Sequence, residues 1–201
     1  AAVAAARLRG LGDEIAADGR VVWLQDTVRV ICDETGPTTL RGLMLDITER
    51  KRNEALRTGQ NQVLEMLTEG RELNEILSAL VSMAEGQAPG MRCSILLLDD
   101  EQRLRVAAAP SFSDEYNSAV DGIRIGPSVG SCGTAAYLGK RVVVEDIATD
   151  PLWEPYRELA QTIGAGACWS EPLLAPDGRV MEMLSDCRRY LLVRYIVLLW
   201  L

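Results

Sequence analysis

The 201-residue sequence contains no histidine. Imidazole is the usual general base near neutral pH, it completes Ser-His-Asp and Cys-His catalytic arrangements, and it is a common ligand of haem iron and zinc. Without it, all of these mechanisms and ligands are removed from consideration. This excludes many classes of enzyme, and we assign no catalytic residue, no metal site and no cofactor.

Basic residues are fewer than acidic ones. Lysine and arginine number 21 against 29 aspartate and glutamate residues, so the formal net charge is −8. Because such a charge opposes binding to phosphate backbones and anionic lipids, we expect neither nucleic acid nor a membrane as a partner. The apolar segment 190–201 has twelve residues and includes Arg194. It falls short of the about 20 residues that cross a bilayer and is interpreted as a strand or an exposed truncated end.

Closely spaced cysteine pairs are missing as well. The five cysteines are Cys32, Cys93, Cys132, Cys168 and Cys187, an odd number without any CxxC motif. This pattern is typical of reduced thiols rather than of a disulfide framework. The first six residues are too few, and lack the basic leader, for a signal peptide. A cytoplasmic location follows, and the missing initiator Met suggests a piece of a longer protein.

Hydrophobic residues make up 48 % of the chain and charged residues 25 %, which is ordinary for a globular protein. The length allows one full domain and a fragment, or two small domains. In the first part, alternating apolar residues predict strands at 20–31 and 40–47, joined by a turn at 33–37. These two strands form a predicted hairpin.

Two helices are predicted next. Segment 49–69 follows a capping signal at Asp46 and Thr48 and has only a thin apolar stripe, which favours a linker helix that pairs with a copy of itself. Segment 72–85 places apolar residues at i, i+3, i+4, i+7, i+8 and i+11, which predicts one continuous buried face.

The rest of the chain alternates between strands and short helices. Strands are predicted at 92–98, 104–109, 141–147, 165–174 and from 179, and helices at 133–138 and 155–163. Most connections are hairpins, so we expect an α+β fold.

The strings DGRVVW at 18–23, DETG at 33–36 and GLMLDITERK at 42–51 resemble the C-terminal end of a PAS domain. The resemblance implies that Asp46, Ile47 and Thr48 end the last strand and start a helix that conducts a signal. It also implies that residues 1–48 are a PAS fragment without the cofactor-holding part, and that 49–71 is a signalling linker helix.

A longer resemblance, over about 73–180, is to GAF domains. It rests on IGPSVGSCGTAA at 125–136, VVEDI at 143–147, DPLW at 150–153 and WSEPL at 169–173. It implies a six-stranded antiparallel sheet with helices on one side, and a small-molecule cavity between the sheet and the helices on the other. The domain is expected to occupy 72–201. Because 181–201 does not follow the family pattern, we interpret it as a truncated or aberrant end.

The expected cavity is assigned a set of candidate ligand-binding residues. Gly130 and Gly133 flank Ser131 and Cys132, so they either let the backbone approach an anion at the helix N-terminus or only turn a loop into a helix. Trp153 and Trp169 offer aromatic faces to a ligand, or they close the core. The candidates are Ile125, Val129, Ser131, Cys132, Thr134, Asp146, Trp153, Tyr156, Cys168, Trp169 and Ser170.

The resemblance implies a sensory module of a bacterial signalling protein, of the sensor kinase or diguanylate cyclase type, which lacks its output domain here. We expect an unknown small-molecule ligand and a homodimer formed through the linker and GAF helices. Cys132 and Cys168 are expected to be buried structural thiols. One alternative is an enzyme like the GAF-type free methionine sulfoxide reductases, with a low pKa at Cys132 and with Cys168 resolving it. However, 142–155, where that family has further redox cysteines, contains none. The other alternative is a dimerisation spacer without a ligand.

Overall fold

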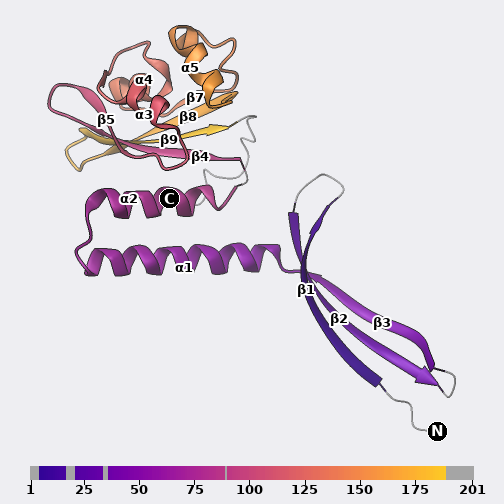
Figure 1. Ribbon diagram of the computed structural model, residues 1–201. Helices are drawn as coiled ribbons and strands as arrows, with labels where there is room; N and C mark the ends of the chain where they lie inside the picture. Colours follow the sequence, from indigo (N-terminus) through magenta and orange to yellow (C-terminus); the bar gives the residue numbers. More distant parts are fainter. Residues whose placement is uncertain (1–4, 17–20, 34–35, 89, 189–201) are drawn as a thin grey trace. The chain divides into compact units, whose positions relative to one another are not determined.

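The first three strands form an antiparallel sheet in the order β1-β2-β3. They are β1 (Ala5–Ile15), β2 (Val21–Asp33) and β3 (Gly36–Asp46). The predicted hairpin is confirmed by the pairing of β2 with β3, as Figure 1 shows. Strand β1 was not predicted because its sequence, AARLRGLGDEI, has few β-branched residues and a weak alternation. It pairs along the whole of its length with β2.

The computed structural model describes residues 5–16, 21–33, 36–88 and 90–188. Two compact units make up the chain, Ala1–Gln60 and Asn61–Leu201. The predicted strand at 190–201 lies outside the described residues. Within the described ranges, no helix is long and apolar enough to cross a membrane.

Helix α1 (Thr48–Thr68) begins directly after β3, one residue before the start that the sequence predicted. The Thr48 hydroxyl accepts a hydrogen bond from the backbone N–H of Trp23 at 2.8 Å, and the Thr48 N–H donates to the Asp46 carboxylate at 2.8 Å. The buried Ile47 between them donates its N–H to the Trp23 carbonyl. The DIT string therefore ties the start of the helix to β2.

Helix α2 (Leu73–Glu85) covers one face of a second sheet. Its buried residues Leu77 and Val81 pack in one cluster with Cys93, Ile95 and Ala108. The predicted apolar face of this helix is confirmed by that cluster. Beneath it lie β4 (Arg92–Leu98) and β5 (Arg103–Ala108).

The second sheet has six antiparallel strands in the order β6-β5-β4-β9-β8-β7. The remaining strands are β6 (Ile123–Arg124), β7 (Val142–Val144), β8 (Ala167–Leu174) and β9 (Val180–Arg188). The α+β fold and the six-stranded sheet are thus confirmed. Strand β7 is shorter than predicted, because the Asp146 carboxylate accepts hydrogen bonds from the Ala148 N–H and the Thr149 hydroxyl and so forms a turn.

We expected the residues after Val180 not to follow the family pattern, but residues 180–188 form strand β9. It lies in the middle of the sheet, paired with β4 on one side and with β8 on the other. The register places Cys187 opposite Cys168, and Ser185 opposite Ser170. Residues 181–188 are therefore an integral part of the domain.

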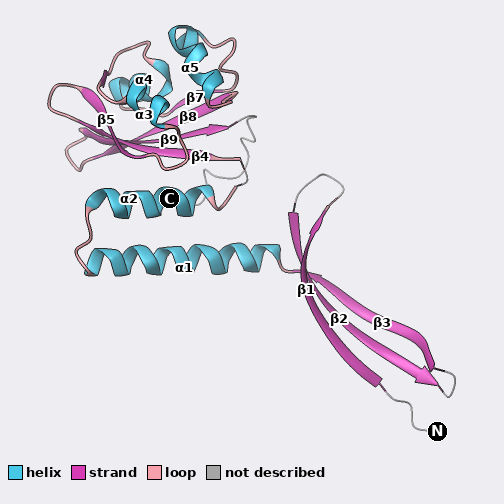
Figure 2. Ribbon diagram, viewed as in Figure 1, coloured by secondary structure: helices cyan, strands magenta, loops and turns pink. Residues whose placement is uncertain are grey.

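The opposite face of this sheet carries the short helices (Figure 2). They are α3 (Asp114–Val120), α4 (Gly130–Leu138), the 3₁₀ helix η1 (Pro151–Tyr156) and α5 (Arg157–Thr162). Helix α3 was not predicted, and α4 begins three residues earlier than predicted. The predicted helix at 155–163 is formed by the end of η1 together with α5.

Candidate functional site

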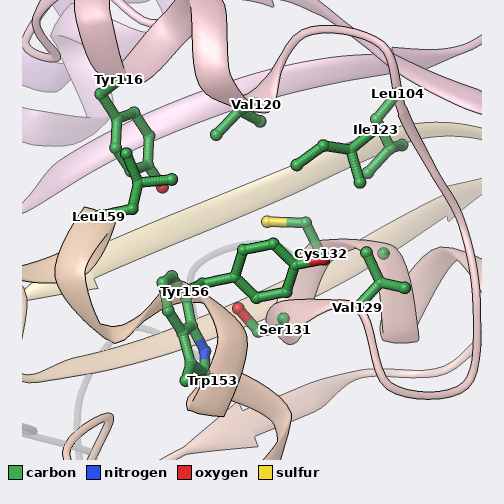
Figure 3. A pocket seen from close by; sticks show the side chains of 12 residues that line it. Leu104, Tyr116, Val120, Ile123, Val129, Ser131, Cys132, Trp153, Tyr156 and Leu159 are labelled. Carbon is green, nitrogen blue, oxygen red and sulfur yellow. The ribbon is translucent and has the colours of Figure 1, made fainter.

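A small pocket lies between the sheet and these short helices (Figure 3). Its volume is about 40 Å³. Because one ordered water needs roughly 10–15 Å³ on this measure, the space equals about three water molecules. The lining comes from β5, α3, β6, the start of α4, η1 and α5: Leu104, Tyr116, Val120, Ile123, Val129, Gly130, Ser131, Cys132, Gly133, Trp153, Tyr156 and Leu159.

The lining carries no charged side chain. Aliphatic residues make one wall, and the aromatic rings of Tyr116, Trp153 and Tyr156 make another. An ion that enters such a site loses its hydration without gaining a counter-charge, which costs several kcal/mol or more. The pocket is therefore suited to an uncharged molecule. No Lys or Arg from the described residues lines it to support the expected anion seat at α4.

Trp153 brings a buried hydrogen-bond donor, its indole N–H, to the pocket. Only 4 % of its surface is exposed, and its indole Nε1 has no hydrogen-bond partner among the residues that the structure describes. The ring is held edge-on to Tyr156, with 6.5 Å between centroids. The Asp150 carboxylate accepts the Leu152 N–H at 2.8 Å and so caps the turn of η1 that carries Trp153.

The first turn of α4 brings Ser131 and Cys132 to the pocket. The hydroxyl of Thr134 accepts the N–H of Val129 at 3.1 Å, which fixes where the helix begins. Ser131 and Cys132 therefore lie on the helix, although the sequence placed them in a loop before it. Gly130 has a φ of +53°, a conformation that favours glycine, at the turn into this helix.

Beneath Ser131 and Cys132, thiols and hydroxyls of β8 and β9 form a buried polar layer. The Ser131 hydroxyl lies 3.0 Å from the sulfur of Cys168. The sulfur of Cys132 lies 2.9 Å from the Ser185 hydroxyl and 3.4 Å from that of Ser170. The two serine hydroxyls are themselves 2.9 Å apart. This layer gives the pocket floor a set of satisfied polar groups inside an apolar domain.

Cys132 does not have the low pKa that a thiolate nucleophile needs. Burial, and then the negative charge that Cys168 would carry, raise the pKa of the Cys132 thiol to about 11. The thiol in hydrogen-bond contact with Cys168 is that of Cys187, at an Sγ–Sγ distance of 3.3 Å. The direction of this pKa shift argues against the alternative in which an activated Cys132 is resolved by Cys168.

Five of the predicted site residues line the pocket: Val129, Ser131, Cys132, Trp153 and Tyr156. Cys168 and Ser170 lie just beneath its floor. Thr134 fixes the start of α4. Ile125 packs in a core cluster with Leu96, Leu104, Ala135 and Met183.

Asp146 and Trp169 are the last two of the six predicted residues that do not line this pocket. Asp146 is exposed in the turn after β7, where its carboxylate holds the Ala148 N–H. Trp169 alternates with Cys168 and Ser170 along β8, so its side chain belongs to the other face of the sheet. There the Arg141 guanidinium lies 6.0 Å from the centroid of its ring.

Seven lining residues were not among the predicted site residues: Leu104, Tyr116, Val120, Ile123, Gly130, Gly133 and Leu159. Tyr116 is the most informative of them, because its ring stacks on Phe112 at 4.7 Å and burial raises the pKa of its hydroxyl above the usual range. A signal was present in the sequence. Ser113 caps α3 by accepting the N–H of Tyr116, and Tyr116 and Val120 have the i, i+4 spacing of one helix face.

A six-stranded antiparallel sheet with α2 on one face and a small pocket under short helices on the other defines the class of this α+β domain. Residues 70–187 match the GAF domain family. This match covers more than half of the chain, and the chain therefore belongs to the GAF domain family. It also includes most of β9, in agreement with the central place of that strand in the sheet.

One relative is the methyl sulfide methyltransferase-associated sensor of Methanosarcina acetivorans, with 41 % identity over 173 residues, or 85 % of this chain. The alignment covers only 17 % of that sensor. Among solved structures, the GAF domain of a phosphoenolpyruvate-protein phosphotransferase from Coxiella burnetii aligns with a TM-score of 0.54 and 16 % identity, over 69 % of this chain and 78 % of its own. The reduced form of fRMsr of Staphylococcus aureus aligns with a TM-score of 0.52 and 16 % identity, over 71 % and 82 % of the two chains. At these identities the structures share the fold alone.

Proposed function

We propose that this GAF domain is the sensory module of a signal-transduction protein and that its pocket binds a small uncharged molecule. The relative of 41 % identity is a sensor. The pocket supports a sensory role because its lining has no charged side chain and combines aromatic rings with a few polar groups.

The observation that carries this proposal is the indole N–H of Trp153 beside the pocket, which finds no acceptor in the described part of the chain. A buried donor without an acceptor costs about 1–3 kcal/mol, and a ligand that accepts the bond recovers that cost. The ligand is therefore expected to carry a hydrogen-bond acceptor that points at Trp153. The rings of Tyr116 and Tyr156 would hold its apolar part.

The volume of the pocket limits the size of the ligand. Space for about three waters admits a molecule with few non-hydrogen atoms, and it excludes a nucleotide or a tetrapyrrole unless the pocket opens. The name of the sensor from Methanosarcina acetivorans refers to methyl sulfide. A methyl sulfide is uncharged and of this size, its sulfur is a weak acceptor, and sulfur makes favourable contacts with aromatic rings. We take dimethyl sulfide as the first probe.

The proposed relay is a shift between two conformations. A ligand that touches Ser131 and Cys132 acts on β8 and β9 through the buried polar layer, and α2 packs on the other face of the same sheet. From α2 the signal would pass to α1 and favour one arrangement of a homodimer. In the full-length protein, that dimer would control an output kinase or cyclase domain. In this proposal the first sheet is the end of a PAS domain, α1 is the linker, and the protein is cytoplasmic.

The test follows the indole N–H resonances of the ¹⁵N-labelled chain while dimethyl sulfide is added. The four tryptophans give separate indole signals, and the variant Trp153→Phe identifies the signal of Trp153. We expect that signal to shift with saturation in the wild type. The matched control is Trp169→Phe, because Trp169 lies on the other face of the sheet and its removal should leave the titration unchanged.

A titration that leaves the Trp153 resonance in place contradicts the choice of a methyl sulfide. If small neutral oxygen acceptors such as dimethyl sulfoxide also leave it in place, the sensory proposal fails and the ligand-free spacer takes its place. Acetate serves as the charged probe of similar size, and no shift is expected with it.

A further inference from the structure

We propose that Cys168 and Cys187 form a reversible disulfide, which makes this GAF domain sensitive to oxidants. The two residues lie directly opposite each other on the neighbouring antiparallel strands β8 and β9. Their sulfurs are 3.3 Å apart. Residues opposite each other in an antiparallel pair have Cα atoms about 4.5–5.5 Å apart, which lies within the range of about 4.4–6.8 Å that a disulfide spans.

The surroundings of the pair favour a bond between these two sulfurs over one with another cysteine. Both are buried, and both belong to the cluster that includes Tyr116 and Trp153. Cys132 is held instead by the hydroxyls of Ser185 and Ser170. Cys93 belongs to the cluster under α2, on the other face of the sheet.

An oxidant can approach through the pocket. Cys168 is in contact with the Ser131 hydroxyl, which lines the pocket. Hydrogen peroxide is small and uncharged and has two non-hydrogen atoms, so it meets the size and charge limits of this pocket. The disulfide does not depend on whether the pocket also binds a sensory ligand.

The chemistry balances with peroxide as the oxidant. The Cys168 sulfur loses its proton and attacks one peroxide oxygen, the O–O bond breaks, and the products are a sulfenic acid at Cys168 and one water. The Cys187 sulfur then attacks the Cys168 sulfur, and the S–O bond breaks as its oxygen leaves as a second water. Two thiols and one peroxide give one disulfide and two waters. A dithiol reductant returns both thiols by exchange.

The bond would change the pocket as well as the strands. In the reduced state the Ser131 hydroxyl and the Cys168 thiol share a hydrogen bond of 3.0 Å. A disulfide sulfur has no proton to donate, and it must also move towards Cys187. Ser131 would then lose or weaken that bond and present its hydroxyl to the pocket. Oxidation is therefore expected to move the indole resonance of the neighbouring Trp153.

Peptide mapping of the wild-type chain tests the pairing directly. Trypsin places the five cysteines in five different peptides, with Cys168 in 158–179 and Cys187 in 180–188. The folded chain is treated with hydrogen peroxide, alkylated, digested and analysed by mass spectrometry. We expect peptides 158–179 and 180–188 to be joined, with the loss of two hydrogens, and to separate again after dithiothreitol.

Three variants complete the test. Cys187→Ser should abolish both the linked peptides and the oxidation-dependent shift of the Trp153 resonance. Cys132→Ser should retain the linked peptides, and the matched buried control Cys93→Ser should retain both the linked peptides and the shift. A link between Cys132 and Cys168, or fully alkylated Cys168 and Cys187 after peroxide treatment, overturns the proposal. Because the wild-type map is decisive alone, a variant that fails to fold does not affect the conclusion.

Discussion

Gly133 lies so close to Val129 that a Cβ atom at position 133 would come within 2.7 Å of the Cβ and Cγ1 of Val129. Real Cβ atoms do not approach other carbons so closely. Because both residues line the pocket, Gly133→Ala forces the wall formed by Val129 to move. We expect overpacking of this kind to lower the free energy of unfolding by about 1–3 kcal/mol, measured by urea denaturation.

The matched control for that substitution is Gly86→Ala. Gly86 has helical dihedral angles, with φ −62° and ψ −17°. The nearest atoms to an added Cβ are carbonyl oxygens at 3.5 Å, an ordinary contact distance. Gly86→Ala is therefore expected to raise the free energy of unfolding by about 0.4–1 kcal/mol. If both glycine variants are equally stable, the close approach of Gly133 to Val129 is not a constraint.

Ser185 lies at the centre of the buried polar layer, so removing its hydroxyl should lower the stability of the domain. Its hydroxyl lies 2.9 Å from the Cys132 sulfur and 2.9 Å from the Ser170 hydroxyl. Ser185→Ala leaves both neighbours short of one partner in the buried interior of the domain. We expect a loss of about 1–3 kcal/mol in the free energy of unfolding, measured by denaturation. Ser82→Ala, at an exposed position on α2, should change stability by less than about 0.5 kcal/mol.

Much of the fold could be predicted because its local patterns agree with its packing. The spacing of apolar residues in α2 predicted the face that buries Leu77 and Val81, and the apolar run at 92–98 predicted β4. Strand β1 was missed, and β9 was predicted only as a strand starting at 179, in a segment whose remainder was interpreted as aberrant. Their sequences alternate weakly, and they are fixed by pairing with strands that lie far away in the chain.

The site was harder to predict than the fold, for two physical reasons. The sequence placed Trp169 in the cavity together with Cys168, but neighbours along a strand point to opposite faces, and only the register of β8 decides which face each takes. Tyr116 and Leu159 reach the pocket from α3 and α5, which are brought together by tertiary packing alone. The motif at 125–136 identified the first turn of α4, but no motif in the sequence pointed to Tyr116 or Leu159.

The pKa of Cys132 gives the domain a stability that declines at alkaline pH. Burial raises this pKa from 9.0 to about 11, so the folded chain retains the proton at pH values where the unfolded chain has lost it. The stabilisation is therefore complete below pH 9 and is lost as the pH rises towards about 11. Thermal unfolding at a series of pH values should show a shallower decline for Cys132→Ser than for the wild type.

Alkylation supplies an independent measurement of the same pKa. The rate at which iodoacetamide modifies Cys132, followed in peptide 125–140, should rise with pH towards a midpoint of about 11. The thiolate is the species that reacts. A midpoint below the usual pKa of a cysteine would contradict the effect of burial and would restore the reductase as a candidate function.

The proposed dimer can be tested on α1, where the exposed leucines do not contribute to the core. Leu64 and Leu67 lie three residues apart on this helix and are 59 % and 54 % exposed, whereas Val63 is buried. We expect a second copy of the chain to cover this side of the helix. The double variant Leu64→Ser with Leu67→Ser should then raise the dimer dissociation constant at least tenfold, measured by analytical ultracentrifugation. The reason is that each leucine buried in the dimer contributes about 1.5–3 kcal/mol. The control pair Gln60→Ser with Gln62→Ser is exposed on the same helix and should leave the dimer intact. A dimer that withstands the leucine substitutions would mean that the chains associate through another surface, whereas a wild-type chain that sediments as a monomer would contradict the dimer itself.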